Sequence, residues 1–202
     1  MADSAFDQPA GREPAPGALA VVQAFVNTYM KHLDGSGGVE HLQHPRDLER
    51  FLAEHDALAP CASVTRAEFE RALEVREALR ALAAVNNGKP LPHAARTTLE
   101  AAADGAGLTL RLGSGAALTA VAPGVPGALG RLLATVSMAM ADGSWARMKS
   151  CAQPNCGWIF FDRSNNRSSR WCTMAICGSR AKMTAHRRRK AGRRAEAPRA
   201  GA

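Results

Sequence analysis

Four cysteines near the end of the chain constrain its fold more than any other feature. They form two pairs with four residues between the thiols of each, Cys151/Cys156 and Cys172/Cys177. A glycine directly follows each pair and lets the chain turn, so each pair can form a metal-binding knuckle. Two such knuckles can bind one tetrahedral Zn²⁺, and four thiolates leave no open coordination position. The pattern predicts one structural zinc ion and no catalytic metal.

Two disulfides, or cysteines that only fill a small core, are the alternatives to a zinc site. A secretory leader would favour disulfides, but residues 1–17 carry Asp3 and Asp7 where a basic region is expected, with no hydrophobic run behind them. We therefore expect a cytoplasmic protein whose thiols stay reduced. The sequence favours the metal site on this ground.

Positive charge is concentrated in the cysteine-bearing end of the chain. The net charge of the protein is +8. Residues 151–202 hold 12 Lys and Arg against Asp162 and Glu196, a net +10, whereas the rest holds 14 basic and 16 acidic residues, a net −2. Four thiolates with one Zn²⁺ would lower the charge of that end by only two. A polyanion, in particular double-stranded DNA, is the expected partner.

The sequence pattern upstream predicts a mainly helical domain with one β-hairpin. Apolar residues recur at helical spacing over 18–32, 45–57, 65–86, 92–103 and 127–141, and the third of these helices begins with the capping box Thr65-Arg-Ala-Glu68. Alternating residues 108–112 and 117–121 predict the hairpin. Together with the zinc finger, these elements give an α+β fold.

The domain limits follow from composition. We expect residues 1–17 and 192–202 to be disordered, 18–148 to form the helical domain and 149–191 to form the finger with a basic helix. No flexible linker precedes Cys151, which predicts that the finger packs directly on the helical domain. No stretch reads as a membrane span, the nearest being 17–26.

Basic residues in the finger are the candidate nucleic-acid contacts. Residues 157–161 read as a strand, 162–170 as an exposed basic loop and 178–190 as a basic helix. A solvated tail is the alternative reading of this charge. The candidate contacts are Arg163, Arg167, Arg170, Arg180, Lys182, Arg187, Arg188, Arg189 and Lys190.

Aromatic residues also concentrate in and beside the finger. Five of the ten aromatics of the chain fall in residues 145–171. They can stack on nucleotides, but a small module needs large side chains to build a core, and the second reading is favoured. They are Trp145, Trp158, Phe160, Phe161 and Trp171.

Residues 151–180 resemble the CGNR zinc finger of bacterial proteins. The resemblance is carried by Cys156-x-Trp158, Asp162-Arg-Ser, Asn166-Arg-Ser, Arg170-Trp-Cys172 and Cys177-Gly-Ser-Arg180. Phe25-Val-Asn-Thr28 and Trp145-Ala-Arg-Met-Lys149 are similar to the ABATE domain that precedes this finger. The resemblance implies a stress-linked bacterial transcription regulator whose finger binds DNA. We expect such a protein to be associated with the nucleoid.

Ser179 departs from that pattern, because the finger's name motif has Asn at this place. Its hydroxyl can still make one capping or bracing hydrogen bond. We expect zinc binding to survive the change.

Other candidate residues lie upstream. His32, His41, His44 and His55 with Cys61 could be grouped into a second metal site, but solvated histidines and an inert thiol are the favoured readings. The sequence has no phosphate-binding glycine loop, nucleophile elbow or distinctive carboxylate pair, so an enzyme is not expected.

A polar pair, Asn27-Thr28, interrupts the apolar run of the first predicted helix. Buried polar groups need hydrogen-bond partners, so the pair predicts either a buried anchor or part of a small-molecule pocket, and the anchor is favoured. The leading hypothesis is a DNA-binding transcription regulator whose upstream domain senses a ligand or forms a homodimer. A zinc-stabilised adaptor of the transcription machinery and an RNA-binding protein are the alternatives.

Overall fold

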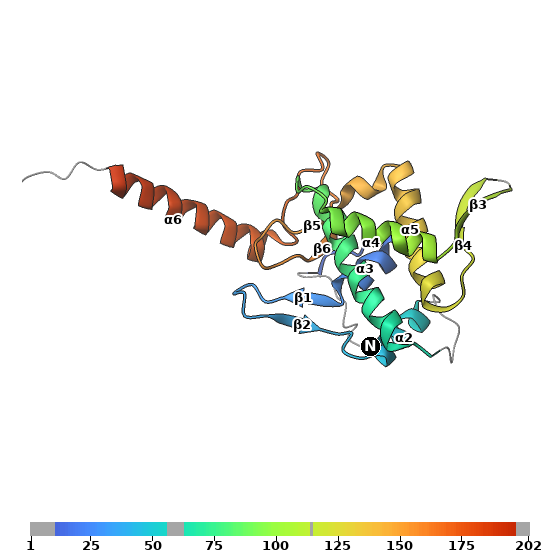
Figure 1. Cartoon of the computed structure of the whole chain (residues 1–202). Helices are drawn as coiled ribbons and strands as arrows, with labels where there is room; N and C mark the ends of the chain where they lie inside the picture. The colour runs from blue at the N-terminus through green and yellow to red at the C-terminus, as the bar shows by residue number, and fades with distance from the viewer. Residues whose placement is uncertain (1–10, 56–62, 114, 197–202) are drawn as a thin grey trace, which may run out of the picture.

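A helical domain, a zinc-finger region and a projecting C-terminal helix succeed one another along the chain (Figure 1). The computed structural model describes residues 11–55, 63–113 and 115–196. Its elements are α1 (Leu19–Asn27), β1 (Tyr29–Lys31), β2 (Gly38–Glu40), α2 (Pro45–Glu54), α3 (Arg66–Val85), α4 (His93–Gly105), β3 (Leu108–Leu112), β4 (Ala116–Ala120), α5 (Gly124–Ala141), η2 (Ser144–Arg147), β5 (Met148–Ser150), β6 (Ile159–Phe161), η3 (Met174–Gly178) and α6 (Ser179–Glu196). The α+β class predicted from the sequence is confirmed.

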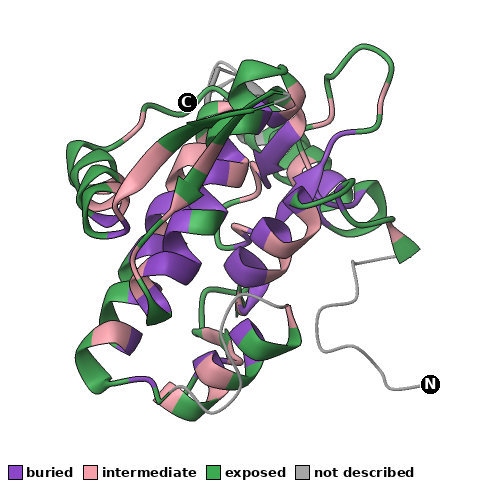
Figure 2. Ribbon diagram, turned by 90° about the vertical axis from the view of Figure 1, so that its right-hand side faces the viewer, coloured by how far each residue is buried: buried purple, intermediate pink, exposed green. Residues whose placement is uncertain are grey.

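The core lies between the helices α1, α3 and α5, whose facing sides are buried (Figure 2). Phe25 of α1 and Leu79 of α3 are fully buried there, and α2 adds Leu48. The predicted capping box begins α3. Thr65 N–H donates to Glu68 Oε2 at 2.9 Å and Glu68 N–H donates to Thr65 Oγ1 at 3.2 Å. Two of the free N–H groups at the helix start are satisfied in this way.

The first predicted helix is shorter than the apolar run implied. It ends at Asn27, and residues 29–31 form a strand with 38–40 instead of a helical turn. Asp34 Oδ1 accepts from Ser36 N–H at 2.9 Å and closes the turn of this hairpin. The expectation of a helix through His32 was therefore wrong, because pairing between Tyr29 and Glu40 replaced local helix propensity.

Three two-stranded antiparallel sheets are present in the described residues, where the sequence predicted one hairpin. The predicted one is β3–β4, with Leu110 opposite Leu118. β1–β2 and β5–β6 were not predicted as hairpins, because the strands are only three residues long and their pairs are set by tertiary contacts.

Helix α5 corrects the expectation about apolar segments. Its 18 residues are long and apolar enough to cross a membrane by length and composition, with a mean hydropathy of 1.2. Half of this segment is buried inside the protein, against α1, α3, α4 and β4. The burial is that of a core helix, and α5, not residues 17–26, is the segment that comes nearest to a membrane span in length and composition.

The finger packs directly on the helical domain, as the absence of a linker predicts. β5 pairs with β6 in the register Met148↔Phe161 and Ser150↔Ile159, so the strand before the first cysteine pairs with the strand between the knuckles. β5 also packs on α3, and β6 on α1. Ile159 and Phe161 join the main hydrophobic core, which fixes the finger relative to the helices.

Candidate metal centre

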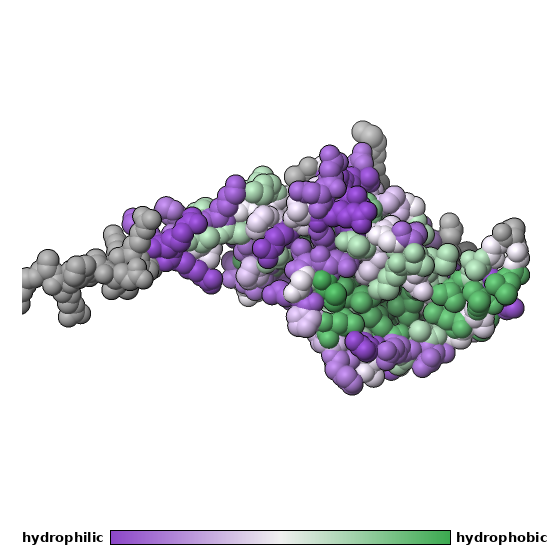
Figure 3. Space-filling model, turned by 90° about the horizontal axis from the view of Figure 1, so that it is seen from above, coloured by the Kyte–Doolittle hydropathy of each residue, from purple (hydrophilic) through white to green (hydrophobic). Residues whose placement is uncertain are grey.

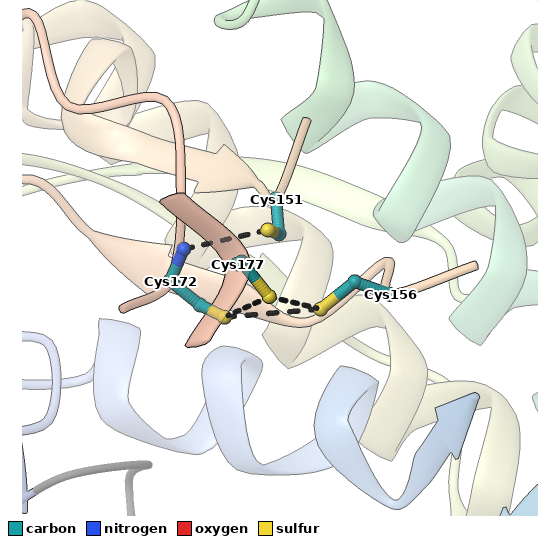
Figure 4. A group of neighbouring side chains, drawn as sticks. All are labelled: Cys151, Cys156, Cys172 and Cys177. Atoms are coloured by element: carbon teal, nitrogen blue, oxygen red, sulfur yellow. Dashed lines mark hydrogen bonds between the residues drawn. The ribbon is translucent and has the colours of Figure 1, made fainter. Parts of the chain in front are cut away.

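The four cysteine thiols of the finger converge on one point (Figure 4). Their sulfur atoms all lie within 4.8 Å of one another. The Sγ–Sγ distances are 3.7 Å for Cys156–Cys172, 3.6 Å for Cys172–Cys177 and 3.8 Å for Cys156–Cys177. A tetrahedral Zn²⁺ with Zn–S bonds of about 2.3 Å requires sulfurs about 3.8 Å apart. The arrangement fits one zinc ion, and all four cysteines are free of disulfides.

Local backbone geometry forms the two knuckles. Cys151 directly follows β5, and two residues separate Cys156 from β6. The backbone adopts a left-handed conformation at two residues, and the chain turns there. They are Asn155 (φ 63°), between the two cysteines, and Gly157 (φ 66°), between Cys156 and β6. In the second knuckle, η3 holds Cys177, and the N–H of Cys172 donates to the sulfur of Cys151 at 3.4 Å. Each sulfur is buried, so solvent does not compete for the metal position.

Hydrogen bonds among the thiols give the four cysteines different pKa values. Bonds from Cys156 and Cys172 lower the pKa of Cys151. The same bonds to Cys151 raise the pKa of Cys156 to about 12 and also raise the pKa of Cys172, whereas burial raises the pKa of Cys177. Zinc must displace the protons that these thiols keep, so zinc binding releases protons and weakens as the pH falls.

Ser179, which stands where the family motif has Asn, braces the second knuckle. Its hydroxyl donates to the carbonyl of Met174 at 3.2 Å, at the junction of η3 and α6. The side chain itself is exposed. The hydroxyl can therefore take a structural role at this position without entering the metal cluster.

A buried ion pair organises the loop between the knuckles. Lys149 Nζ lies 2.8 Å from Asp162 Oδ2, and the two side chains are 6% and 0% exposed. Lys149 also donates to the carbonyls of Arg167 and Ser169. Burial opposes charge on Asp162, but hydrogen bonds from Lys149 and then from Ser164 hold the pKa of its carboxyl below the usual range. The pair sets the course of residues 162–170.

The loop presents its arginines to solvent. Arg163, Arg167 and Arg170 are all exposed, and Arg167 has a φ of 52°. The backbone beneath them is held by Arg147, which donates to the carbonyls of Asp162 and Ser164 at 2.8 and 3.0 Å. The loop thus combines exposed cationic side chains with a main chain that is held by hydrogen bonds.

The basic residues predicted in the last helix are also exposed. Arg180, Lys182 and residues 187–190 lie on α6, which projects away from the rest of the molecule (Figure 1). Within the residues whose side chains are described, none of them pairs with a carboxylate. The helix extends to Glu196, so residues 192–196, assigned above to a disordered tail, are helical. Residues 197–202 lie outside the described part.

Four of the five aromatics in this region are buried. Trp145 and Phe161 belong to the main core, and Trp158 and Phe160 pack around the cysteines. Trp171 is half-buried. The favoured interpretation, that these aromatics build the core of a small module, holds for the four buried residues. Trp171 is the one of the five that is partly accessible to solvent.

The predicted polar pair lies at the contact between the helical domain and the finger. Asn27 Nδ2 donates to the carbonyl of Ile159, and Asn27 Oδ1 accepts from the N–H of Ile159, both at 2.9 Å. Thr28 Oγ1 donates to the carbonyl of Phe25 at 2.8 Å and accepts from Arg76 Nη1 at 3.1 Å. These contacts are those of a buried anchor. The Asn27 amide bonds to both backbone groups of Ile159, as the backbone of a neighbouring strand would, and so joins α1 to β6.

Two buried arginines of α3, which the sequence reading missed, complete this contact. Arg80 donates to the carbonyl of Gly157 at 2.6 Å and to those of Val26 and Tyr29 at 2.6 and 3.0 Å. It thereby joins the end of α1 to the first knuckle. Arg76 binds Glu40 through two nitrogens at 2.7 Å. Both arginines fall on the apolar face of α3. Their position in the helical repeat is the sequence signal that could have predicted their burial.

The end of α3 supplies a second tie to the finger. Asn86 Nδ2 donates to the carbonyls of Trp145 and Met148 at 2.7 and 2.8 Å. Asn87 Nδ2 donates to the carbonyls of Ser150 and Arg170 at 2.7 and 3.0 Å. The sequence reading treated this Asn pair only as a helix stop. Its side chains instead bind the main chain just before each cysteine pair.

Residues 11–17, expected to be disordered, pack across the finger. Arg12 donates to the carbonyls of Trp171 and Cys172, and its guanidinium lies 4.7 Å from the ring centroid of Phe160. Ala15 is buried, and its N–H donates to Gln23 Oε1 at 2.6 Å. Expecting disorder from the Pro, Gly and Ala content was wrong for this segment, because one arginine finds carbonyl and aromatic partners.

Truncation of that arginine should loosen the metal centre. We expect Arg12→Ala to lower the free energy of unfolding of the finger by about 1–2 kcal/mol, because it removes charge-assisted hydrogen bonds and a cation–π contact. The rate of zinc release to a chelator measures the effect. Glu13→Gln is the matched control, since Glu13 is exposed and contacts Arg163 only at 3.3 Å. Equal release rates for both variants would contradict a bracing role for Arg12.

No second metal site is formed by the upstream histidines that are described. The cysteine cluster is the one group of three or more metal-binding side chains in residues 11–55, 63–113 and 115–196. His32 contacts Ser36 Oγ, and His55 lies 4.5 Å from the ring of Phe51. Cys61 lies outside the described residues.

A structural four-cysteine centre fixed to a helical domain defines the class as zinc-finger proteins. Residues 147–190 match the model of the CGNR zinc finger. Residues 19–143 match ABATE, a family described as "Putative stress-induced transcription regulator". The second match covers more than half of the chain, which therefore belongs to the ABATE family, and the resemblance in the sequence is confirmed.

The two matches follow one another in the predicted order, and neither is to an enzyme family. No curated protein matches the sequence. The family and the cysteine geometry together assign zinc as the cofactor of this chain.

Proposed function

We propose that this protein is a cytoplasmic, zinc-dependent transcription regulator, not an enzyme, that binds double-stranded DNA through its finger and α6. The observation that carries the proposal is the exposure of the basic loop and the basic helix on one metal-held module. The family description, a transcription regulator, supports the same reading.

The shape of the module supports contact with a duplex. α6 has 18 residues, a length of about 27 Å at 1.5 Å per residue, enough to follow a DNA groove. Basic residues occur on several of its faces, so it can contact phosphates on both sides of a groove. On the face shown in Figure 3, hydrophilic side chains predominate on the coloured part of this arm, whereas hydrophobic ones gather toward the opposite end.

In this proposal the helical domain keeps its predicted bounds, residues 18–148, and has a regulatory role. Leu110 and Leu112 of β3 are 58% and 79% exposed, and Met138 of α5 is 46% exposed. Beside them, α5, β4 and residues 16–19 line a cavity of about 790 Å³. These apolar surfaces support either a homodimer contact or binding of a small-molecule effector, far from the basic arm.

Binding to duplex DNA should depend steeply on salt, because each phosphate contact releases condensed counterions. We expect the triple substitution Arg187→Gln, Arg188→Gln and Arg189→Gln to reduce affinity and to lower the log–log salt slope by about 2–3. Fluorescence anisotropy with a labelled duplex between 50 and 200 mM salt measures both quantities.

A control with the same charge change separates local contact from net charge. Arg46, Arg96 and Arg111 are exposed on the helical domain, and their triple Gln variant should bind nearly as wild type does. Failure of zinc-loaded wild type to bind any duplex at low salt would overturn the proposal. Preference for single-stranded RNA, or a protein partner recovered after nuclease treatment, would support the RNA-binding or adaptor alternative instead.

A further inference from the structure

A groove lies between the first knuckle and α6, on the face of the finger that carries Trp171. Its volume is about 500 Å³. Its lining includes Pro154 of the first knuckle, Arg170 and Trp171 before the second knuckle, and Thr184, Ala185 and Arg188 of α6. We call it the knuckle groove.

The charges of the knuckle groove fit an anion. Its charged lining residues, Arg170 and Arg188, are both exposed arginines, and none of its lining residues is acidic. Guanidinium groups bind the oxygens of phosphates, as of carboxylates, through two parallel hydrogen bonds, and two of them match the higher charge that a phosphate can carry. Two guanidiniums at one groove therefore favour a phosphate ester.

The aromatic residue of the groove adds a flat apolar surface. The guanidinium of Arg170 lies 6.0 Å from the ring centroid of Trp171. A planar ring beside a cation is suited to a group with an apolar face and a charged end, such as a sugar attached to phosphate.

The helical side of the groove leaves room for such a group. Thr184 and Ala185 lie three and four residues after Ala181, and Arg188 follows them by four and three, so the four residues share one face of α6. The two alanines keep the passage open, and the hydroxyl of Thr184 can donate a hydrogen bond.

The main chain at the centre of the groove is held in place before any ligand binds. The carbonyl of Arg170 accepts from Ala152 N–H at 2.8 Å and from Asn87 Nδ2 at 3.0 Å. The carbonyl of Trp171 accepts from Arg12 at 3.2 Å. Binding then orders only side-chain tips, which lowers its entropic cost.

We propose that the knuckle groove binds one sugar–phosphate unit of a DNA duplex, with Arg170 and Arg188 on the phosphate and Trp171 against the deoxyribose. This inference rests on the proposed function and names its anchoring contact. A phosphate held beside the zinc fixes the register of the finger on the duplex and directs α6 along the adjacent groove.

Two neighbouring arginines of α6 give a matched test. Arg187 and Arg188 are both exposed and carry the same charge, but only Arg188 lines the groove. We expect Arg188→Gln to weaken duplex binding by about tenfold, since it removes a charge-assisted phosphate contact, and Arg187→Gln by about two- to threefold. Both variants should keep wild-type zinc content, because neither side chain contacts the core.

Tryptophan fluorescence tests the groove without a change to its arginines. Trp145 and Trp158 are 4% and 5% exposed, so quenching by acrylamide reports mainly Trp171. Duplex DNA should protect wild type from quenching, and Trp171→Phe serves as the background. If wild type binds duplex but the two arginine variants weaken equally and Trp171 stays accessible, the groove proposal is overturned while the proposed function stands. If wild type binds no duplex, the proposed function itself fails.

Discussion

Loss of zinc is expected to unfold residues 151–178 and to reduce the stability of the helical domain as well. A structural zinc ion contributes about 10–16 kcal/mol of binding free energy near neutral pH, and that energy is folding energy for a site absent from the unfolded chain. The hydrophobic core of the finger itself is small. Among the described residues, the hydrophobic side chains that pack around its cysteines are Trp158, Phe160 and two partly buried ones, Leu33 and Trp171.

The loss of zinc should also destabilise the helices, because residues of the finger and of the helical domain bury one another. Ile159 is fully buried in the main core, and its backbone is the partner of Asn27. When β6 unfolds, the amide of Asn27 and the guanidinium of Arg80 lose buried partners, which costs about 1–3 kcal/mol for each unsatisfied group. We therefore expect the melting temperature of the helical domain to fall along with loss of the finger.

Chelator titration followed by circular dichroism and zinc analysis measures this effect. Cys172→Ser should reproduce it in the presence of zinc, because one hydroxyl replaces a thiolate ligand. Cys61→Ser is the control, since Cys61 is the fifth cysteine and lies apart from the two pairs in the sequence. Unchanged secondary structure in metal-free protein would contradict the assignment of a structural metal.

Breaking the ion pair between Lys149 and Asp162 should lower the free energy of unfolding by about 3–5 kcal/mol. Either Lys149→Met or Asp162→Asn leaves an uncompensated group inside the protein, which is the costly outcome for a buried pair. Asp162 also accepts from the N–H groups of Ser164 and Ser169, so the loop loses its organisation with the pair. Denaturant unfolding of zinc-loaded protein measures the change.

The acid response of this pair has a definite sign. The pKa of Asp162 in the folded protein lies below its usual value near 4. The charged carboxylate therefore stabilises the fold at pH values above about 4, and this stabilisation is lost as the pH falls through the folded pKa. Asp162→Asn should show a smaller loss of stability in this acid range than wild type does. Glu70→Gln is the control, because its partner Arg66 is 76% exposed and surface pairs contribute about 0–1 kcal/mol. An effect of Asp162→Asn no larger than that of the control would refute the structural role of the pair.

The features that the sequence predicted are those coded by neighbouring residues. The spacing of the cysteine pairs, the capping box at Thr65 and the alternation of residues 108–112 each specify a short piece of chain with its own chemistry. The Asn pair at 86 and 87 shows the limit of such coding. Its sequence indicates only a helix stop, although its amides bind carbonyls about 60 to 80 residues away.

The sequence by itself determined the metal, the basic finger and the helical character of the upstream domain, because ligand spacing, net charge and periodicity act locally. Tertiary structure alone decided that α1 ends at Asn27, that Arg76 and Arg80 are buried and that Arg12 braces the finger. Each of those outcomes depends on a partner distant in sequence. Polar groups buried at the contact between helices and finger must be paired, and only the folded chain specifies with what.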